Sequence, residues 1–235
     1  MQRLDAATGV QYFKQTADID LFGQIWTPIK FSGNFDGNGK TISNVKIDLP
    51  NSNYIGFFST LSSGGELKNV RLENVDVKGK SYVGGLVGEA SGSISNSYAL
   101  GNVTGSSNYV GGLVGYTGIT SSVCNSYASG SVTGSSFYVG GLVGAVFGKI
   151  FNSYASVNVK GFAVIGGLVG IFDTTSSISN SYYDREITNN PDNGKGIPRT
   201  TTEMKTGTPS ETIYTGWDPA IWDFGDDTDY PKLRK

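Results

Sequence analysis

Apolar and polar residues alternate in short segments of this chain instead of following a helical spacing. In the segments 42–44, 67–69 and 94–96, an apolar residue stands two positions before an asparagine. A period of two is typical of a strand with one buried face. A second set of apolar positions precedes a glycine by two residues and predicts strands that end in turns: Val77, Val103, Val132 and Val159. The pattern predicts an all-β protein.

Two phrases recur in step along the sequence. YVGGLVG stands at 82–88, 109–115 and 138–144, with VIGGLVG at 164–170, and NSY stands at 96–98, 125–127, 152–154 and 180–182. Two phrases with one common period of about 27 residues indicate a single structural unit that is copied along the chain.

A unit of this size accommodates three short strands and three turns. One such coil cannot bury its own apolar face, so stability must come from stacking parallel strands about 4.8 Å apart. We therefore predict a β-solenoid of about six coils, with three short strands in each. The expected organisation is an N-terminal cap and lead-in at residues 1–40, the array at 41–183 and a C-terminal cap at 184–235.

Asparagine recurs at one position of every predicted coil. A buried amide is costly unless it is paired, and in a stack each amide can donate a hydrogen bond to the amide of the next coil. We therefore predict a structural asparagine ladder, which consists of Asn44, Asn69, Asn96, Asn125, Asn152 and Asn180.

The ends and corners of the array carry their own signals. Thr200 and Glu203 have the spacing of a capping box and predict a short helix. Large apolar residues after this helix are expected to plug the last coil: Trp217, Trp222, Phe224, Tyr230 and Leu233. The paired glycines of the repeats, such as Gly111-Gly112, are expected to provide positive φ or close backbone approach at a corner.

Composition narrows the function classes. The net charge of −2 gives no reason to expect nucleic acid or an anionic membrane as a partner, and no apolar run is long enough to span a bilayer. Histidine is absent, which removes the commonest general base and metal ligand. The single Cys124 excludes an internal disulfide. No secretion signal is visible at the start of the sequence, so we expect the chain to be part of a larger parent protein.

The repeated phrases resemble a known family. YVGGLVG, followed by NSYA and VTG, is similar to the GLUG repeat, and the lead-in QTADIDL and the tail segments NSYYDRE and YPKLR also resemble that family. GLUG repeats occur in large adhesin-like surface and secreted proteins of bacteria and in some immunoglobulin A-directed metallopeptidases. The resemblance implies an extracellular or cell-surface β-solenoid that serves as a stalk or adhesive module beside other domains. It implies no catalytic activity.

A tyrosine column is the leading candidate binding site. Tyr98, Tyr127, Tyr154 and Tyr182 close the NSY phrases and occupy the place of Lys46 and Arg71 in earlier coils. Because charged side chains belong outside, we expect the tyrosines to be exposed, with Ser97 and Ala99 inside. Such a stripe could bind a glycan or a protein, or the rings could simply stack to stabilise the sheet. Both interpretations stay open, and stacking is favoured.

A second tyrosine column has no clear orientation in the sequence. It consists of Tyr54, Tyr82, Tyr109 and Tyr138 and is interrupted by Val164. Structural stacking is the favoured interpretation here as well.

Carboxylates in the tail offer a different kind of site. Asp184 and Glu186, or else Asp226, Asp227 and Asp229, could provide the carboxyl groups of a polysaccharide hydrolase or lyase, and a hydrolase would need two of them roughly 5–10 Å apart. Asp226, Asp227 and Asp229 could hold Ca²⁺ through oxygen ligands, although a solvated acidic loop is the favoured interpretation. No other cofactor or metal is expected.

The sequence thus supports three hypotheses. The preferred one is a non-catalytic adhesive or spacer module of a bacterial cell-surface or secreted protein, whose exposed tyrosines contact a host or environmental glycan or a surface protein. The alternatives are a carbohydrate-active enzyme that uses the tail carboxylates and a pure spacer without a ligand.

Overall fold

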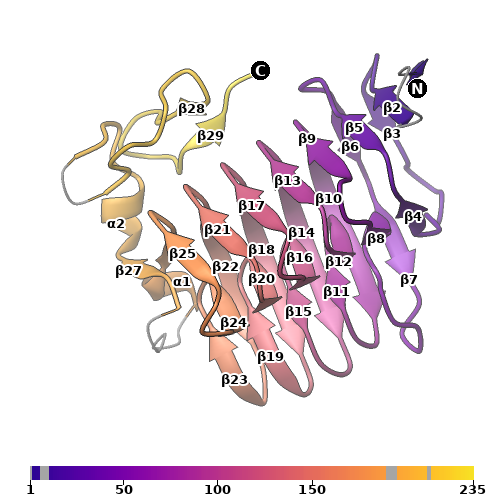
Figure 1. Cartoon of the computed structure of the whole chain (residues 1–235). Helices are drawn as coiled ribbons and strands as arrows, with labels where there is room; N and C mark the ends of the chain where they lie inside the picture. Colours follow the sequence, from indigo (N-terminus) through magenta and orange to yellow (C-terminus); the bar gives the residue numbers. More distant parts are fainter. Residues whose placement is uncertain (1, 6–10, 189–194, 211–212) are drawn as a thin grey trace.

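The computed structural model describes residues 2–5, 11–188, 195–210 and 213–235. The chain winds into a β-solenoid of about six turns, in which parallel strands stack in register from coil to coil (Figure 1). This confirms the predicted fold class.

Three long sheets and one short sheet make the walls of the solenoid. Sheet 1 contains β1 Gln2–Asp5, β2 Gln11–Lys14, β5 Asn34–Asp36, β9 Glu66–Lys68, β13 Ser93–Ser95, β17 Ser122–Cys124, β21 Lys149–Phe151 and β25 Ser177–Ser179. Sheet 2 contains β3 Ile19–Asp20, β6 Thr41–Ser43, β7 Lys46–Asp48, β10 Arg71–Gly79, β14 Tyr98–Gly105, β18 Tyr127–Gly134, β22 Tyr154–Lys160, β26 Tyr182–Asp184 and β27 Ile197–Arg199.

The other two sheets complete each coil. Sheet 3 has strands of only two to four residues: β11 Val83–Gly84, β15 Val110–Gly111, β19 Phe137–Gly140 and β23 Ala163–Gly166. Sheet 4 contains β4 Ile29–Phe31, β8 Phe58–Leu61, β12 Val87–Ala90, β16 Val114–Thr117, β20 Val143–Val146 and β24 Val169–Phe172. The central coils therefore add one very short strand to the three that the pattern predicts.

Equivalent residues of the repeats are direct strand partners. Tyr98 pairs with Tyr127, which pairs with Tyr154, which pairs with Tyr182. The interior is a single apolar core that runs along the axis, and the alternating residues of sheet 1, such as Ile94, are fully buried in it. Stacking is thus what buries each coil, as the period implies.

The repeated glycines allow close approach of successive coils. A Cβ atom at Gly112 would lie 2.3 Å from the carbonyl oxygen of Gly141, so no side chain fits there. Positive φ, however, falls on the preceding tyrosines: φ is 56° at Tyr82, 64° at Tyr109 and 65° at Tyr138. Of the two roles expected for the paired glycines, close approach is the one the structure shows.

Parallel stacking begins earlier than predicted. Strand β2 pairs in parallel with β5, and β3 pairs in parallel with β6, although both strands precede residue 41. The predicted N-terminal cap therefore contributes strands to the same sheets as the array.

The C-terminal segment folds back over the outside of the solenoid. It contains α1 Arg185–Thr188, α2 Thr201–Met204 and the antiparallel pair β28 Trp222–Asp223 and β29 Lys232–Leu233. The capping box of Thr200 and Glu203 is confirmed. In Figure 1 this segment (yellow) rises beside the last coils and returns toward the middle of the array.

The prediction that aromatic residues of the tail plug the last coil is wrong about where these residues lie. Trp217 and Trp222 pack on the outer tyrosines of sheet 2 and belong to a second apolar cluster, separate from the interior core. Tyr183, which is 1% exposed, fills the interior end instead and lies against Gly167. The large tail side chains cannot enter the end of the core because Tyr183 already occupies that place.

Candidate binding surfaces

Each NSY phrase makes one corner of the solenoid. The asparagine has a left-handed backbone at all six positions, with φ between 43° and 58°. Among residues with a Cβ atom, asparagine tolerates this conformation best. The backbone therefore provides a reason for asparagine at every corner between sheets 1 and 2.

Of the predicted bonds between ladder amides, the described residues show one, from Asn96 to Asn69. The Asn96 amide donates to Asn69 Oδ1 at 3.4 Å, and the Asn69 amide donates to Asp36 Oδ1 at 2.9 Å. The Asn44 amide donates to Asp20 Oδ1 at 2.7 Å, and this bond is the main cause that lowers the pKa of the Asp20 carboxyl group. For Asn125, Asn152 and Asn180 the described residues show no amide–amide bond, so the left-handed backbone accounts for these corners.

The serine of each phrase forms a more continuous ladder inside the corner. The backbone N–H of Ser97 donates to Ser126 Oγ, that of Ser126 to Ser153 Oγ and that of Ser153 to Ser181 Oγ, each at 3.2 Å. All four serines are buried. The inward direction of Ser97 was expected. The serine ladder was not predicted, but the serine that recurs in every NSY phrase is the sequence feature that could have indicated it.

The tyrosines of the phrases point away from the interior, as expected, but they are not exposed. The Tyr98 and Tyr127 rings stack with centroids 4.8 Å apart, and so do the Tyr127 and Tyr154 rings. The exposed fractions are only 6% for Tyr98 and Tyr127, 1% for Tyr154 and 3% for Tyr182. Exposure was wrongly predicted because the tail, which belongs to no repeat, covers this face of sheet 2.

Aromatic side chains of the tail provide the cover. Trp222 lies 6.0 Å from the Tyr154 ring and 6.1 Å from the Tyr127 ring, measured between centroids. Burial raises the pKa of the Tyr98, Tyr127 and Tyr154 phenols well above the ordinary value for tyrosine. The column is therefore an interface within the chain that the tail covers, and at its Tyr98 end only 6% of that tyrosine stays accessible.

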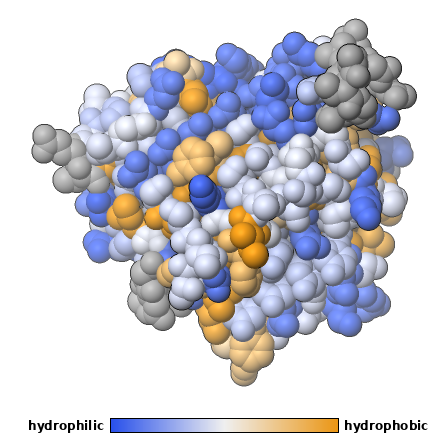
Figure 2. All heavy atoms as spheres, viewed as in Figure 1, coloured by the Kyte–Doolittle hydropathy of each residue, from blue (hydrophilic) through white to orange (hydrophobic). Residues whose placement is uncertain are grey.

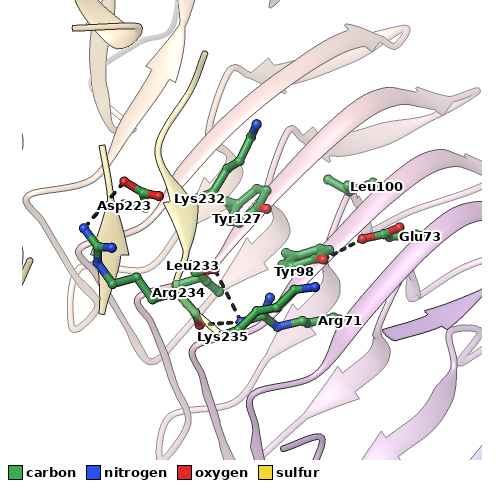
Figure 3. A pocket seen from close by; sticks show the side chains of 10 residues that line it. All are labelled: Arg71, Glu73, Tyr98, Leu100, Tyr127, Asp223, Lys232, Leu233, Arg234 and Lys235. Atoms are coloured by element: carbon green, nitrogen blue, oxygen red, sulfur yellow. Dashed lines mark hydrogen bonds and ion pairs between the residues drawn. The ribbon is translucent and has the colours of Figure 1, made fainter. Parts of the chain in front are cut away.

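A groove of about 530 Å³ opens at that end, between the Tyr98 side of the column and β29 (Figure 3). The Tyr98 hydroxyl donates to Glu73 Oε1 at 2.7 Å. The Arg71 guanidinium lies under the terminal segment and donates through Nη2 to the backbone carbonyls of Leu233 and Arg234. Two of the predicted tyrosines, Tyr98 and Tyr127, thus line a hollow with charged walls.

The second tyrosine column is the one that stays uncovered. Ring centroids are 4.6 Å apart for Tyr54 and Tyr82, 4.9 Å for Tyr82 and Tyr109, and 5.2 Å for Tyr109 and Tyr138. Tyr54 is 38% exposed, and the other three are half-buried. The predicted stacking is confirmed, and the column forms an accessible ridge along the axis.

Other aromatic side chains widen this ridge. Tyr116 meets Tyr82 and Tyr109 edge-on, at 5.8 and 5.7 Å, and packs on Phe147 at 5.2 Å. The only acidic or basic residues between positions 81 and 182 are Glu89, Lys149, Lys160 and Asp173. Beyond the ridge, hydrophobic residues gather at the lower tip of Figure 2, near β23. Phe162, which precedes β23 in the sequence, is 81% exposed.

The tail carboxylates hold structure together. Asp184 is fully buried, and its two oxygens accept hydrogen bonds from the backbone N–H of Glu186 and Ile187, from Thr201 Oγ1 and from the Tyr230 hydroxyl. Glu186 accepts from the backbone N–H of Thr201. Asp184 is therefore saturated and closed to a substrate, which speaks against the predicted pair of catalytic carboxylates.

The three aspartates suggested for Ca²⁺ do not converge. Asp226 accepts from Thr228, Asp227 from the backbone N–H of Gly207, and Asp229 forms an ion pair of 2.8 Å with Lys232. Within the part of the chain that the structure describes, no group of three or more acidic, Cys or His residues is placed to hold a metal ion. The interpretation as a solvated acidic loop fits this arrangement.

The repeats match a known family model. The GLUG motif matches residues 79–104, 106–133 and 135–160. The chain carries three GLUG motifs. This confirms the resemblance seen in the sequence, and it places the matches on the central coils that carry both tyrosine columns.

Stretches of two much longer proteins are similar to this chain in sequence. Halomucin of Haloquadratum walsbyi is 38% identical over 126 residues, which is 46% of this chain and 1% of halomucin. A "Putative Gly-rich membrane protein" of Evansella cellulosilytica is 33% identical over 147 residues, which is 59% of this chain and 13% of that protein. The chain thus spans only a small part of either relative.

A crystal structure described as "a putative immunoglobulin A1 protease from Bacteroides ovatus" has the same fold. The TM-score is 0.66 at 20% identity, over 95% of this chain and 85% of that one. At this identity the likeness shows the fold alone. Among the described residues of the GLUG chain, no helix is long and apolar enough to cross a bilayer.

Proposed function

We propose that this GLUG solenoid is a non-catalytic contact module of a secreted or cell-surface protein and that it binds a glycan along the uncovered ridge of Tyr54, Tyr82, Tyr109 and Tyr138. The names of the relatives, a mucin and a membrane protein, support the location. The observation that carries the proposal is the ridge itself, which repeats one aromatic side chain per coil on an accessible face.

The backbone under the ridge supports a role for the rings. Tyr54, Tyr82, Tyr109 and Tyr138 all have a left-handed backbone, with φ of 56–65°. For a residue other than glycine this conformation costs about 1–2 kcal/mol, and asparagine or glycine would adopt it more readily. Aromatic stacking offsets about 0.5–1.5 kcal/mol of this cost for each pair. Stacking thus helps tyrosine to hold these corners, although Val164 adopts the same conformation, with φ of 48°, at the equivalent position of the next coil.

The shape and charge of the ridge favour a linear neutral glycan. The ridge is only one to two rings wide. A standard protein interface buries roughly 800 Å² on each partner and needs a broader surface than this. An extended β-1,4-linked glycan is similarly narrow and advances by nearly one coil spacing with each sugar. Glu89, the acidic residue nearest to the ridge, contributes to the raised pKa of Tyr82 and Tyr116, after the larger effect of burial, and its charge would disfavour an acidic chain.

Binding to soluble β-1,4-glucan and β-1,4-mannan oligosaccharides tests the proposal. The double variant Tyr82→Phe/Tyr109→Phe keeps the stack but removes two hydroxyl groups, and Tyr82→Ala/Tyr109→Ala removes the surface. We expect weaker binding in the first and no binding in the second. Tyr12→Ala, a change to an exposed tyrosine of β2 outside the ridge, is the matched control and should bind like the parent.

Other outcomes would separate the alternatives. Equal binding by all variants would place the glycan outside the ridge, whereas no binding by the parent would favour a spacer or a protein ligand. Either result would leave the ridge with a purely structural role. Cleavage of either oligosaccharide that disappears in Asp184→Asn would favour the enzyme instead. Thermal unfolding of each variant shows whether lost binding reflects lost folding.

A further inference from the structure

The terminal segment of β29 lies between two adjoining hollows on the other tyrosine face. The first is the groove of about 530 Å³ shown in Figure 3, and the second, of about 300 Å³, lies on the side of the asparagine corners. Arg71 and Lys235 line both hollows. Volumes of this order are typical of sites for small ligands.

Most charges around the hollows are already engaged. Asp223 pairs with Arg234 at 3.5 Å, Lys232 pairs with Asp229 at 2.8 Å, and Glu73 accepts from Tyr98. The Lys235 ammonium has no partner among the described residues, and in Figure 3 its side chain extends beside the Arg71 guanidinium. Two neighbouring cations thus stand at the junction of the hollows, and no ion pair among the described residues engages either of them.

Two buried polar atoms at the same place also lack partners. Arg71 is only 5% exposed, and its Nε has no hydrogen-bond partner; Asn96 Oδ1, at the second hollow, has none either. Buried polar groups are normally satisfied, so an unpaired donor and an unpaired acceptor at one site point to a missing ligand or solvent. Such a ligand would offer both an acceptor and a donor.

An acidic sugar has the matching chemistry. Its carboxylate would accept from Arg71 Nε after a small shift of the guanidinium and would pair with the Lys235 ammonium, because charge-assisted bonds are the strongest available there. Its hydroxyl groups would donate to Glu73 and, after a small shift of the side chain, to Asn96 Oδ1, and its apolar ring face would lie against Tyr98 and Leu100. These four kinds of contact converge from sheet 2 and the tail.

We infer that the hollows flanking residues 233–235 form a second binding site, which takes a carboxylate-bearing saccharide. This site lies on the opposite tyrosine column from the ridge and goes beyond the proposed function. It stands even if the ridge binds nothing.

Titration with tri-galacturonate and with its methyl ester tests the inference, because the two probes differ only in charge. We expect the acid to bind and the ester to bind at least tenfold more weakly, with affinity for the acid falling as salt rises. Lys235→Ala should lower the affinity for the acid at least tenfold, and Lys235→Arg should restore most of it. Lys149→Ala, an exposed change on β21, is the control.

Three results would overturn the inference. These are equal binding of the acid and the ester, unchanged affinity in Lys235→Ala, and loss of binding in Lys149→Ala to the same extent. Arg71→Lys adds a check on the site. Its melting temperature must be measured as well, because Arg71 also anchors the tail. If this variant both folds and binds like the parent, Arg71 is not part of the site.

Discussion

The Tyr154 hydroxyl donates a hydrogen bond of 2.7 Å to the backbone carbonyl of Pro231, which lies 77 residues later in the chain. Tyr154 is also stacked on Tyr127 and packed against Trp217 and Trp222. One side chain therefore joins its own coil, the preceding coil and the tail. It follows that the tail is part of the folding unit and cannot be treated as a loose extension.

Trp222→Ala should destabilise the whole solenoid. Trp222 is fully buried between the tyrosine column and the tail, and truncating a buried tryptophan costs about 3–5 kcal/mol. The free energy of unfolding, from denaturant titration followed by circular dichroism, measures this cost. Phe162→Ala, at a side chain that is 81% exposed, should change stability by less than about 0.5 kcal/mol. Equal effects of the two changes would mean that the tail does not pack as described.

Substitutions at Asn125 separate the two reasons for asparagine at the corners. Its φ is 46°, a conformation that costs most side chains about 1–2 kcal/mol. Asn125→Leu should therefore lower the free energy of unfolding by about this amount, whereas Asn125→Gly should stay closer to the parent. If both variants lost the same stability, pairing of the amide would be the dominant effect instead. Melting temperatures of the three proteins decide between the two.

Ser126→Ala should reveal the serine ladder. The Ser126 hydroxyl accepts from the Ser97 backbone N–H at 3.2 Å and donates to the Cys124 carbonyl at 2.7 Å. Its removal leaves a buried N–H without a partner, which costs about 1–3 kcal/mol. Ser131→Ala removes a hydroxyl whose bond to Asn102 is exposed, so it should cost clearly less. If the serine ladder contributed nothing to the free energy of unfolding, Ser126→Ala and Ser131→Ala would give the same unfolding curve.

Repetition explains which features the sequence could reveal. One period governs the solenoid, the corner asparagines and the outward direction of Tyr98. In a stack of coils, equivalent residues have equivalent surroundings, so the repeat in the sequence predicts the repeat in the structure. The tail is not repeated in the sequence. The contact between Tyr154 and Trp222 joins a repeat to this unique segment, so no periodicity in the sequence predicts it. The left-handed tyrosines were equally hidden, because tyrosine is not a residue that marks this conformation.

High pH should unfold the protein through the covered tyrosines. Burial raises the pKa of the Tyr98, Tyr127 and Tyr154 phenols above the ordinary value of 10.0. A group whose pKa is raised on folding stabilises the fold fully below its unfolded pKa, and this stability is lost as pH rises above that value. The free energy of unfolding should therefore fall between about pH 9 and about pH 12. Denaturant titrations across this range, with tyrosinate absorbance as a second probe, measure the loss. Tyr154→Phe removes one buried phenol and should flatten the dependence; an equally steep fall in this variant would place the alkaline sensitivity elsewhere.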